Sequence, residues 1–404
     1  MIKFLQKLGP GLLFAGAAIG VSHLVQSTKA GSNFGFGLLW ALLLINLIKY
    51  PFFQYGPRYA AATGENLLSG YKKLGKWALR FYALLTLATM FTIQTAVTIV
   101  TAGIASSLLG SSLSLELWAV IILGFCFILL LLGKYNLLDK IMKIIIILLS
   151  ISTLLAVGIA FNNNSGELPW TQVFPASNVE VVFLIAFMGW MPAPLDVSIW
   201  HSLWAVEKQK TTDVFNKKSA LLDFNIGYVS TIILGVCFLL LGGLVMYGNG
   251  KSFSDSGGEF SLQLIDMYTD NLGDWSFAII GVAAFTTMFS TTLTTLDASP
   301  RAMNKTMELI LEKKIKKGYN AWLILLILGT VIIFFLFLSE MGSLIKIATI
   351  LSFLTAPFYA LMNYLVLCSK HTPKAWQPSK TMHILSIFGI LFLVGFNIWY
   401  LSIL

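Results

Sequence analysis

The sequence predicts an all-α integral membrane protein with eleven transmembrane helices, for three reasons. The first is composition: 57% of the 404 residues are hydrophobic and 11% are charged, too little charge to cover a soluble protein of this length. Apolar runs of about 18 to 25 residues recur along the chain, and each is long enough to cross a bilayer as a helix. Finally, basic residues gather in alternate connections between these runs, as membrane topology requires.

Short connections join the eleven predicted spans. The spans cover roughly residues 10–31, 34–55, 80–108, 113–133, 138–161, 179–205, 219–247, 274–296, 319–339, 344–367 and 382–403. No connection is long enough to hold a soluble domain, so we predict a single membrane transport domain over residues 1–404. The first apolar run starts near Gly9 and continues into a full span, and no cleavable signal is expected.

Basic residues fall on one side of the predicted bundle, and the connections on the other side carry almost none. The six basic clusters are Lys3 and Lys7; Arg58, Lys72, Lys73, Lys76 and Arg80; Lys134, Lys140 and Lys143; Lys208, Lys210, Lys217 and Lys218; Arg301, Lys305, Lys313, Lys314, Lys316 and Lys317; and Lys370, Lys374 and Lys380. Because basic loops stay in the cytoplasm, we predict a cytoplasmic N-terminus and an external C-terminus, in the cell membrane. The net charge of +9 then reflects topology, and no nucleic-acid partner is predicted.

Helix breakers interrupt the first and the sixth predicted spans. The first contains GAAIGVSH, with Gly16, Gly20 and Ser22 at its centre, and the sixth contains GWMPAPLD. Such paired interruptions five spans apart predict an inverted-repeat secondary transporter, because broken helices expose backbone groups that only a cavity or a ligand can satisfy. The predicted units are a first repeat over 1–161, a second over 162–367 and an extra helix over 368–404. For either span alone, a structural kink is the alternative.

Several segments, in the right order along most of the chain, resemble the NRAMP (natural resistance-associated macrophage protein) family of divalent-metal transporters. GPGLLFAG at 9–16 and QSTKAGSNFGFGLLW at 26–40 resemble the start of that family, and ATGENL at 62–67 resembles its segment after the second span. MP at 191–192 matches part of its Met-Pro-His motif, and LSFLTAPFYAL at 351–361 resembles its tenth span. The resemblance implies the amino acid–polyamine–organocation, or leucine-transporter-like, fold: two inverted five-helix repeats plus one extra helix.

The chain departs from that family at the residues that bind metal. The family carries Asp-Pro-Gly-Asn at the first-helix break, and an ungapped count from Gly-Pro-Gly places this motif on Gly20, Val21, Ser22 and His23. Glycine therefore replaces the metal-binding aspartate. The metal-binding methionine falls on Met191, but the family's histidine falls on Ala193. The third span, FTIQTAVTIVTAGIASSLLG, lacks the family's acidic groups for proton movement, and one imidazole with one thioether makes a weak site for a divalent cation.

Candidate site residues follow from the two breaks and from polar groups inside the spans. The predicted substrate-binding residues are Gly20, Val21, Ser22, His23, Gln26, Gln94, Met188, Gly189, Met191 and Ala193. The predicted coupling-ion residues are Asp196, Asp297, Thr291 and Thr294. The implied superfamily often holds Na⁺ between the first and eighth spans, which favours these threonines. Structural alternatives are pairing of Asp196 with His201 or a neighbouring helix, an Asp297 that caps the helix end or pairs with Arg301, and glutamines that only bridge helices.

We therefore predict a secondary active transporter that imports a small anion such as bicarbonate, or a small polar solute, coupled to Na⁺. Without the first-span aspartate, no carboxylate neutralises the positive partial charge at the N-terminal ends of the half-helices, which favours an anion. One alternative is an importer of Mn²⁺ or Fe²⁺ that uses His23 and Met191 as metal ligands. The alternative of another class is an ion channel, although no selectivity-filter pattern occurs. No enzyme and no cofactor other than Na⁺ is predicted, and the oligomeric state is left open.

Overall fold

The computed structural model describes residues 8–109, 113–163, 170–211, 217–248, 253–254, 257–337 and 341–403, and all regular secondary structure in these ranges is helical. In chain order the elements are α2 (Pro10–Ala18), the π-helix η1 (Ser22–Ser27), α3 (Thr28–Phe34), α4 (Leu39–Thr63), α5 (Leu67–Leu74), α6 (Lys76–Leu109), α7 (Leu115–Asn163), α8 (Asn178–Trp190), α9 (Val197–Thr211), α10 (Lys217–Val245), α11 (Gly257–Leu272), α12 (Ser276–Leu311), α13 (Gly318–Phe337), α14 (Met341–Cys368), the 3₁₀-helix η3 (Lys374–Trp376) and α15 (Lys380–Ile403). The predicted all-α class is confirmed.

Eight helical stretches in the described ranges are long and apolar enough to cross a membrane. The bent pair formed by α2 and the helix from η1 to α3 would make nine. The predicted spans 34–55 and 179–205 correspond to α4 and to α8 with α9, which do not meet the same measure. The number of eleven spans and their orientation in the membrane therefore remain predictions.

Two predicted spans belong to a single helical element. The segments 113–133 and 138–161 both fall within α7, which holds two separate candidate spans, Leu115–Leu132 and Lys140–Asn163. Helical hydrogen bonding continues through the residues between them, where the sequence analysis expected a connection. The basic residues at this place therefore extend from a helix and not from a loop.

The eighth predicted span ends later than expected. Its predicted end at residue 296 is corrected, because α12 continues to Leu311 and contains Pro300. The Ser-Pro pair looks like a helix end, but a proline inside a helix removes one hydrogen bond without always ending the helix. Asp297 consequently lies within α12 and not at its terminus.

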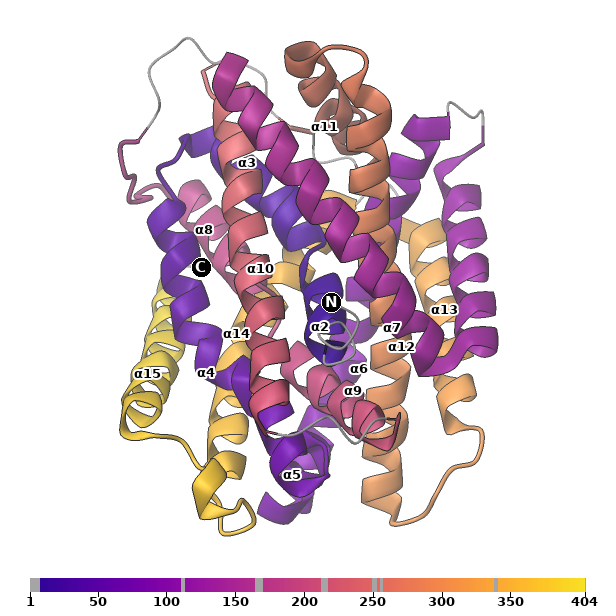
Figure 1. Ribbon diagram of the computed structural model, residues 1–404, viewed down its shortest axis with the longest axis vertical. Coiled ribbons are helices and arrows are strands. Elements are labelled where there is room, and N and C mark those ends of the chain that lie inside the picture. Colours follow the sequence, from indigo (N-terminus) through magenta and orange to yellow (C-terminus); the bar gives the residue numbers. More distant parts are fainter. Residues whose placement is uncertain are drawn as a thin grey trace.

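The ends of the bundle differ in composition. Figure 1 shows α5, the connection between α12 and α13, and η3 together at one end, and α11 at the opposite end. The first end carries most of the basic residues of the described connections, among them Lys72, Lys313 and Lys374. On the outer surface of the bundle, exposed side chains such as Leu132, Phe335 and Ile384 are apolar. Such a surface suits contact with lipid.

The short helix α2 is held at its start by α10. The backbone N–H groups of Gly9 and Gly11 donate to the Asp223 carboxylate at 2.9 and 2.6 Å. This satisfies donors that have no partner within the helix. The helices approach so closely that a Cβ on Gly11 would lie 2.0 Å from the carbonyl oxygen of Asp223, and one on Gly227 would lie 2.1 Å from that of Gly11. The Gly-Pro-Gly segment therefore allows the start of α2 to pack closely against α10.

Candidate substrate site at two broken helices

The first broken helix runs through the middle of the bundle. α2 ends at Ala18, Ile19 and Gly20 are not helical, and the helix that resumes at Ser22 is bent by 48° from α2. Gly20 is required here because a Cβ at this position would lie 2.4 Å from the hydroxyl oxygen of Thr291 in α12. Any larger residue would push the break away from α12.

The second broken helix is interrupted by six residues, since α8 ends at Trp190 and α9 begins at Val197. Pro192 and Pro194 lie in this segment, and neither has an N–H group to continue the helical ladder. The peptide bond between Met191 and Pro192 is cis. The prolines therefore leave carbonyl groups at the end of α8 without their helical donors.

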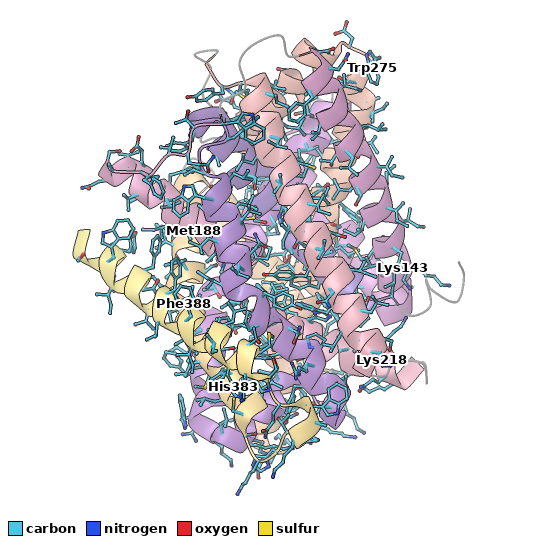
Figure 2. The ribbon with its side chains drawn as sticks, turned by 60° about the vertical axis from the view of Figure 1, so that its left-hand side comes forward. Lys143, Met188, Lys218, Trp275, His383 and Phe388 are labelled. Carbon is cyan, nitrogen blue, oxygen red and sulfur yellow. The ribbon has the colours of Figure 1, made fainter. Side chains whose placement is uncertain are left out.

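The two breaks lie against each other. The Ser22 hydroxyl oxygen is 3.3 Å from the carbonyl oxygen of Pro192. Figure 2 places Met188, in the last turn of α8, about midway between Trp275 at one end of the molecule and His383 at the other. The prediction that both spans are interrupted and face one another is confirmed. The second interruption begins later than predicted, because Met188 and Gly189 still belong to α8.

A cavity of about 30 Å³ lies between the two breaks, α6 and α12. Small apolar side chains form most of its wall, and its polar groups are the hydroxyls of Ser22, Thr291 and Thr295 with the indoles of Trp190 and Trp200. Among the described residues, no ionisable side chain lines it. A cavity of this size holds one or two water molecules, or a solute of similar bulk.

Only part of the predicted substrate-binding set lines this cavity. Gly20, Val21 and Ser22 do so. The remaining predicted residues lie outside its wall: His23, Gln26, Gln94, Met188, Gly189, Met191 and Ala193. Most of these residues are nevertheless engaged in the packing of the two breaks, as the following contacts describe.

Both ring nitrogens of His23 are occupied by protein groups. Nδ1 lies 2.7 Å from the Ser22 hydroxyl, and Nε2 lies 2.9 Å from the backbone carbonyl oxygen of Thr231 in α10. A carbonyl oxygen only accepts, so Nε2–H donates to it, and Nδ1 lies against the Ser22 hydroxyl, whose oxygen is also 2.8 Å from the carbonyl oxygen of Ala18. Neither nitrogen then offers a free lone pair to a metal. The sequence could not reveal this, because the partner is a main-chain oxygen from a distant helix.

Lys49, inside α4, is a site residue that the sequence analysis missed. Its side chain is fully buried, and Nζ lies 2.9, 2.7 and 2.8 Å from the carbonyl oxygens of Met188, Gly189 and Met191. A fourth carbonyl oxygen, that of Ala193, is 3.4 Å away. These four predicted residues therefore contribute backbone oxygens and not side chains. The signal in the sequence was a lysine inside a predicted span, which is a functional candidate by default.

Five oxygen atoms meet where the end of α2 packs on α12. The Thr291 hydroxyl lies 3.1, 3.0 and 3.3 Å from the carbonyl oxygens of Gly16, Ile19 and Thr287. The Ser290 hydroxyl lies 3.2 and 2.7 Å from those of Gly16 and Thr287. Each hydroxyl has one hydrogen, so the two can fill only two of these five contacts. A cation at the centre would stabilise the excess of oxygen atoms, since hard cations prefer oxygen ligands.

The predicted coupling-ion residues divide between this cluster and other places. Thr291 belongs to the cluster, whereas the Thr294 hydroxyl donates to the Ser290 carbonyl oxygen of its own helix at 2.7 Å. The sequence analysis missed Ser290, which looked like one hydroxyl among many in FSTTLTT. It also missed the carbonyl groups of Gly16 and Ile19, because main-chain ligands leave no mark in a sequence.

Asp297 is enclosed by partners from three helices. Its carboxylate accepts from Nη2 and Nε of Arg301 at 2.6 and 3.1 Å, from Nε1 of Trp204 in α9 at 3.1 Å and from the Tyr319 hydroxyl in α13 at 2.9 Å. The structural alternative of the sequence analysis, pairing with Arg301, therefore exists. Each carboxylate oxygen accepts two hydrogen bonds, and the carboxylate thereby links α9, α12 and α13.

Asp196 lies just before α9 and is buried. One of its oxygens, Oδ1, has no hydrogen-bond partner in the described part of the chain. Lys49 and Tyr82 are close enough to interact with it electrostatically. The alternative pairing with His201 is absent, because both ring nitrogens of His201 also lack partners and its ring stacks on Phe14 at 5.5 Å.

The two predicted glutamines have different surroundings. Gln94 in α6 donates through Nε2 to the Thr98 hydroxyl at 3.2 Å and to the Thr292 carbonyl oxygen of α12 at 3.4 Å. It therefore bridges α6 and α12, as the structural alternative proposed. Gln26 is buried in η1. The described residues contain no group of three or more His, Cys, Asp or Glu side chains that could hold a metal ion.

A helical bundle with apolar outer helices, two broken helices at its centre and a small cavity between the breaks defines a membrane transporter. The family model "Natural resistance-associated macrophage protein-like" (Nramp) matches residues 11–402, and the chain belongs to this family of membrane transporters. An uncharacterized protein of Pasteurella multocida (strain Pm70) is 36% identical over 402 residues, which are 98% of this chain and 92% of the relative. The resemblance in the sequence is thereby confirmed.

Solved structures with the same fold include transporters of several kinds. A variant of the manganese transporter of Eremococcus coleocola aligns with a TM-score of 0.69 at 14% identity, over 99% of this chain and 94% of its own. MhsT in complex with L-phenylalanine aligns with a TM-score of 0.67 at 14% identity, over 96% and 98% of the two chains. Mhp1, a nucleobase-cation-symport-1 family transporter with bromovinylhydantoin bound, aligns with a TM-score of 0.61 at 15% identity, over 98% and 93%. At these identities the likeness shows a shared fold.

Proposed function

We propose that this member of the Nramp family is a secondary active transporter that imports a small anion such as bicarbonate, or a small polar solute, together with Na⁺. The observation that carries this proposal is the cavity between the two breaks, whose wall has hydroxyl and indole groups but, among the described residues, no ionisable side chain. The solved structures that share this fold include a manganese transporter and proteins with an amino acid or a hydantoin bound. The fold alone therefore does not determine the substrate.

The groups around the cavity favour a solute that accepts hydrogen bonds. The buried indole N–H of Trp200 has no partner among the described residues and can donate, whereas the hydroxyls of Ser22, Thr291 and Thr295 already lie within hydrogen-bond distance of carbonyl oxygens. Gly20 and Val21 precede a helix, and the first amides of a helix have no partner within it and carry its positive end. A cation would meet no carboxylate among the described residues of this wall, whereas the oxygens of a small anion would meet the Trp200 indole N–H and the first amides of the resumed helix.

Na⁺ coupling rests on the five oxygens between α2 and α12. They belong to the broken helix and to a helix that packs beside it, so a cation bound there would fix the position of the break. Binding of Na⁺ and of the solute would then support each other, because both require the same arrangement of the first span. Three carbonyl oxygens and the hydroxyls of Ser290 and Thr291 supply the ligands.

The proposed placement in the membrane follows the basic residues. Eleven transmembrane helices, with α4 and the pair α8–α9 counted as spans, would put the N-terminus in the cytoplasm and the C-terminus outside, in the cell membrane. α4 would contain polar side chains in the bilayer, but Asn46, Lys49 and Gln54 are buried within the protein. This burial removes the objection that a polar helix cannot cross lipid.

Replacement of the two hydroxyl ligands tests the Na⁺ site. Ser290→Ala and Thr291→Val should each weaken the apparent Na⁺ affinity roughly tenfold, which corresponds to about 1.4 kcal/mol for one lost ligand. The measurement is the rise of the melting temperature of the purified protein with NaCl relative to choline chloride. Thr286→Val is the matched control, because the Thr286 hydroxyl contacts carbonyl oxygens of its own helix, those of Val282 and Ala283, at 2.8 and 3.0 Å. An unchanged Na⁺ response in Ser290→Ala/Thr291→Val would refute the site.

Import of Mn²⁺ or Fe²⁺ is the second candidate, favoured by family membership and by the manganese transporter among the solved relatives. Against it stand the occupied nitrogens of His23 and the position of Met191 outside the cavity wall. Calorimetry with Mn²⁺ distinguishes the two: we expect no micromolar binding, and such binding would establish the metal function. An ion channel would instead conduct without dependence on a second ion.

A gain of metal binding is the complementary test. Gly20→Asp with His23→Asn restores the first and last residues of the family's motif, but an aspartate at 20 collides with the Thr291 side chain. Thr291→Ala removes the two nearest atoms, which would lie 2.4 and 2.8 Å from the new Cβ. The triple variant should therefore bind Mn²⁺ more tightly than the wild type, whereas Gly20→Asp alone should mainly destabilise the protein.

A further inference from the structure

The end of α8 has a ring of backbone oxygens that would suit a cation. In a continuous helix, the carbonyl group of Met188 would accept from the backbone nitrogen of residue 192. That residue is Pro192, which has no N–H. The C-terminal end of a helix also carries partial negative charge. The break therefore collects electron-rich oxygens at mid-height in the bundle, beside the proposed solute cavity.

Lys49 fills this ring from α4. Three carbonyl oxygens, those of Met188, Gly189 and Met191, lie 2.7 to 2.9 Å from Nζ, and the Ala193 oxygen lies 3.4 Å away. Three short contacts to atoms that can only accept need three N–H donors. A neutral amine has two, so the geometry is that of the charged ammonium. The nitrogen thus stands where a bound cation would stand, surrounded by oxygens of the interrupted helix.

We propose that Lys49 is a tethered cation: its ammonium permanently occupies a cation position at the break of the second interrupted helix and keeps metal ions out of this half of the site. The buried carboxylate of Asp196 is close enough to interact with this charge. Lys49 is then a specificity-determining residue, because an arriving divalent cation finds its carbonyl ligands already used and a positive charge in place.

This inference deepens the proposed function, since it takes the cavity between the breaks as the solute site. The occupancy of the carbonyl ring by a cation can nevertheless be measured without any substrate. Lys49→Ala deletes three methylene groups and the ammonium, and the deleted atoms correspond to one molecule of propylammonium. A free amine of this size can therefore enter the vacated space and take up the same three hydrogen bonds.

The experiment compares melting temperatures of wild type, Lys49→Ala and Lys49→Met in detergent, with propylammonium chloride, tetramethylammonium chloride or 1-propanol added. We expect Lys49→Ala to melt below the wild type and to regain most of the loss with propylammonium only. Tetramethylammonium has charge but no N–H donors, and 1-propanol has the same bulk without charge. Lys49→Met keeps a long side chain in the space, so it should melt low and stay low. If Lys49→Ala can be purified only with amine present, the yield of monodisperse protein replaces the melting temperature.

Two results would overturn the proposal. One is a Lys49→Met protein as stable as the wild type, which would mean that Lys49 serves only by the bulk of its side chain. The other is a Lys49→Ala protein that no amine stabilises or that 1-propanol stabilises equally. Neither result depends on the identity of the transported solute. Conversely, Mn²⁺ transport by the wild type would refute the anion proposal and the exclusion of metal by Lys49, whereas rescue by propylammonium would still show that a cation fills the carbonyl ring.

A second measurement addresses specificity directly. Mn²⁺ binding to Lys49→Ala is followed by calorimetry without amine and again with propylammonium. We expect the variant to gain Mn²⁺ affinity at least tenfold over the wild type, and propylammonium to reverse the gain by competition. Lys29→Ala is the matched control, since Lys29 lies in α3 outside the carbonyl ring and its ammonium packs over Phe260 at 5.5 Å. No gain, or a gain that propylammonium leaves unchanged, would show that Lys49 does not exclude metal.

Discussion

Several buried side chains in this protein bind backbone groups that broken or short helices leave without partners. Lys49 donates to carbonyl oxygens at the end of α8, and Thr291 contacts those at the end of α2. Asp223 accepts from the N–H groups at the start of α2. A buried backbone group without a hydrogen-bond partner destabilises the folded protein, so each of these side chains stabilises the fold by supplying that partner.

The Asp223→Asn variant tests whether the Asp223 carboxylate holds the start of α2 against α10. The amide keeps one oxygen but places an NH₂ group against a backbone N–H donor, so one of the two hydrogen bonds becomes a repulsion. We expect a loss of about 1–2 kcal/mol of stability, as for a lost helix cap. The measurement is thermal unfolding in detergent, with Asp274→Asn, at an exposed turn, as the control. Equal stability of the two variants would show that the carboxylate does not hold the helix.

Among the helices, the interruption of the first and sixth spans follows from residues that the sequence displays. Gly20 allows close approach to α12, and the two prolines after Met191 remove helical donors. The groups that contact the site residues at the two breaks could not be predicted from the sequence. The ligands of the proposed Na⁺ site are partly main-chain oxygens, and the partner of His23 is the carbonyl group of Thr231. Lys49 could have been found, because a charge inside a span always needs an explanation.

The junction of α9, α12 and α13 should depend on Asp297. Asp297→Asn leaves the partly buried guanidinium of Arg301 without its charge partner, which should cost less than the about 3–5 kcal/mol of a fully buried pair. We expect a clearly lower melting temperature but an unchanged Na⁺-induced rise, because Asp297 is not one of the five oxygens beside α2. A variant that keeps its stability and loses the Na⁺ response would instead give Asp297 the coupling role expected from the sequence.

For the complete bundle, the class and the family were predictable, because composition and motif order extend over the full length. The boundaries were harder. α7 holds two candidate spans without a break in its helical hydrogen bonding, and α12 continues past Pro300. Local signals such as a lysine cluster or a Ser-Pro pair mark a probable helix end only statistically, and tertiary packing decides whether the helix continues.

Orientation can be tested with single cysteines. In a background without Cys126, Cys237 and Cys368, Lys313→Cys and Trp275→Cys place one thiol at each end of the molecule (Figures 1 and 2). We expect a membrane-impermeant maleimide to label the cysteine at 275 in intact cells, and the one at 313 only after the membrane is opened. The reverse pattern would invert the proposed topology, and equal labelling would mean that the two ends share one side.

The central claim is that the site accepts an anionic or polar solute with Na⁺ in place of a metal ion. Uptake into proteoliposomes tests it most directly, with bicarbonate and Mn²⁺ offered in parallel under an inward Na⁺ gradient, a pH gradient or neither. We predict that bicarbonate accumulates only when the Na⁺ gradient is present and that Mn²⁺ does not enter. Accumulation of Mn²⁺ driven by the pH gradient and indifferent to Na⁺ would contradict the claim.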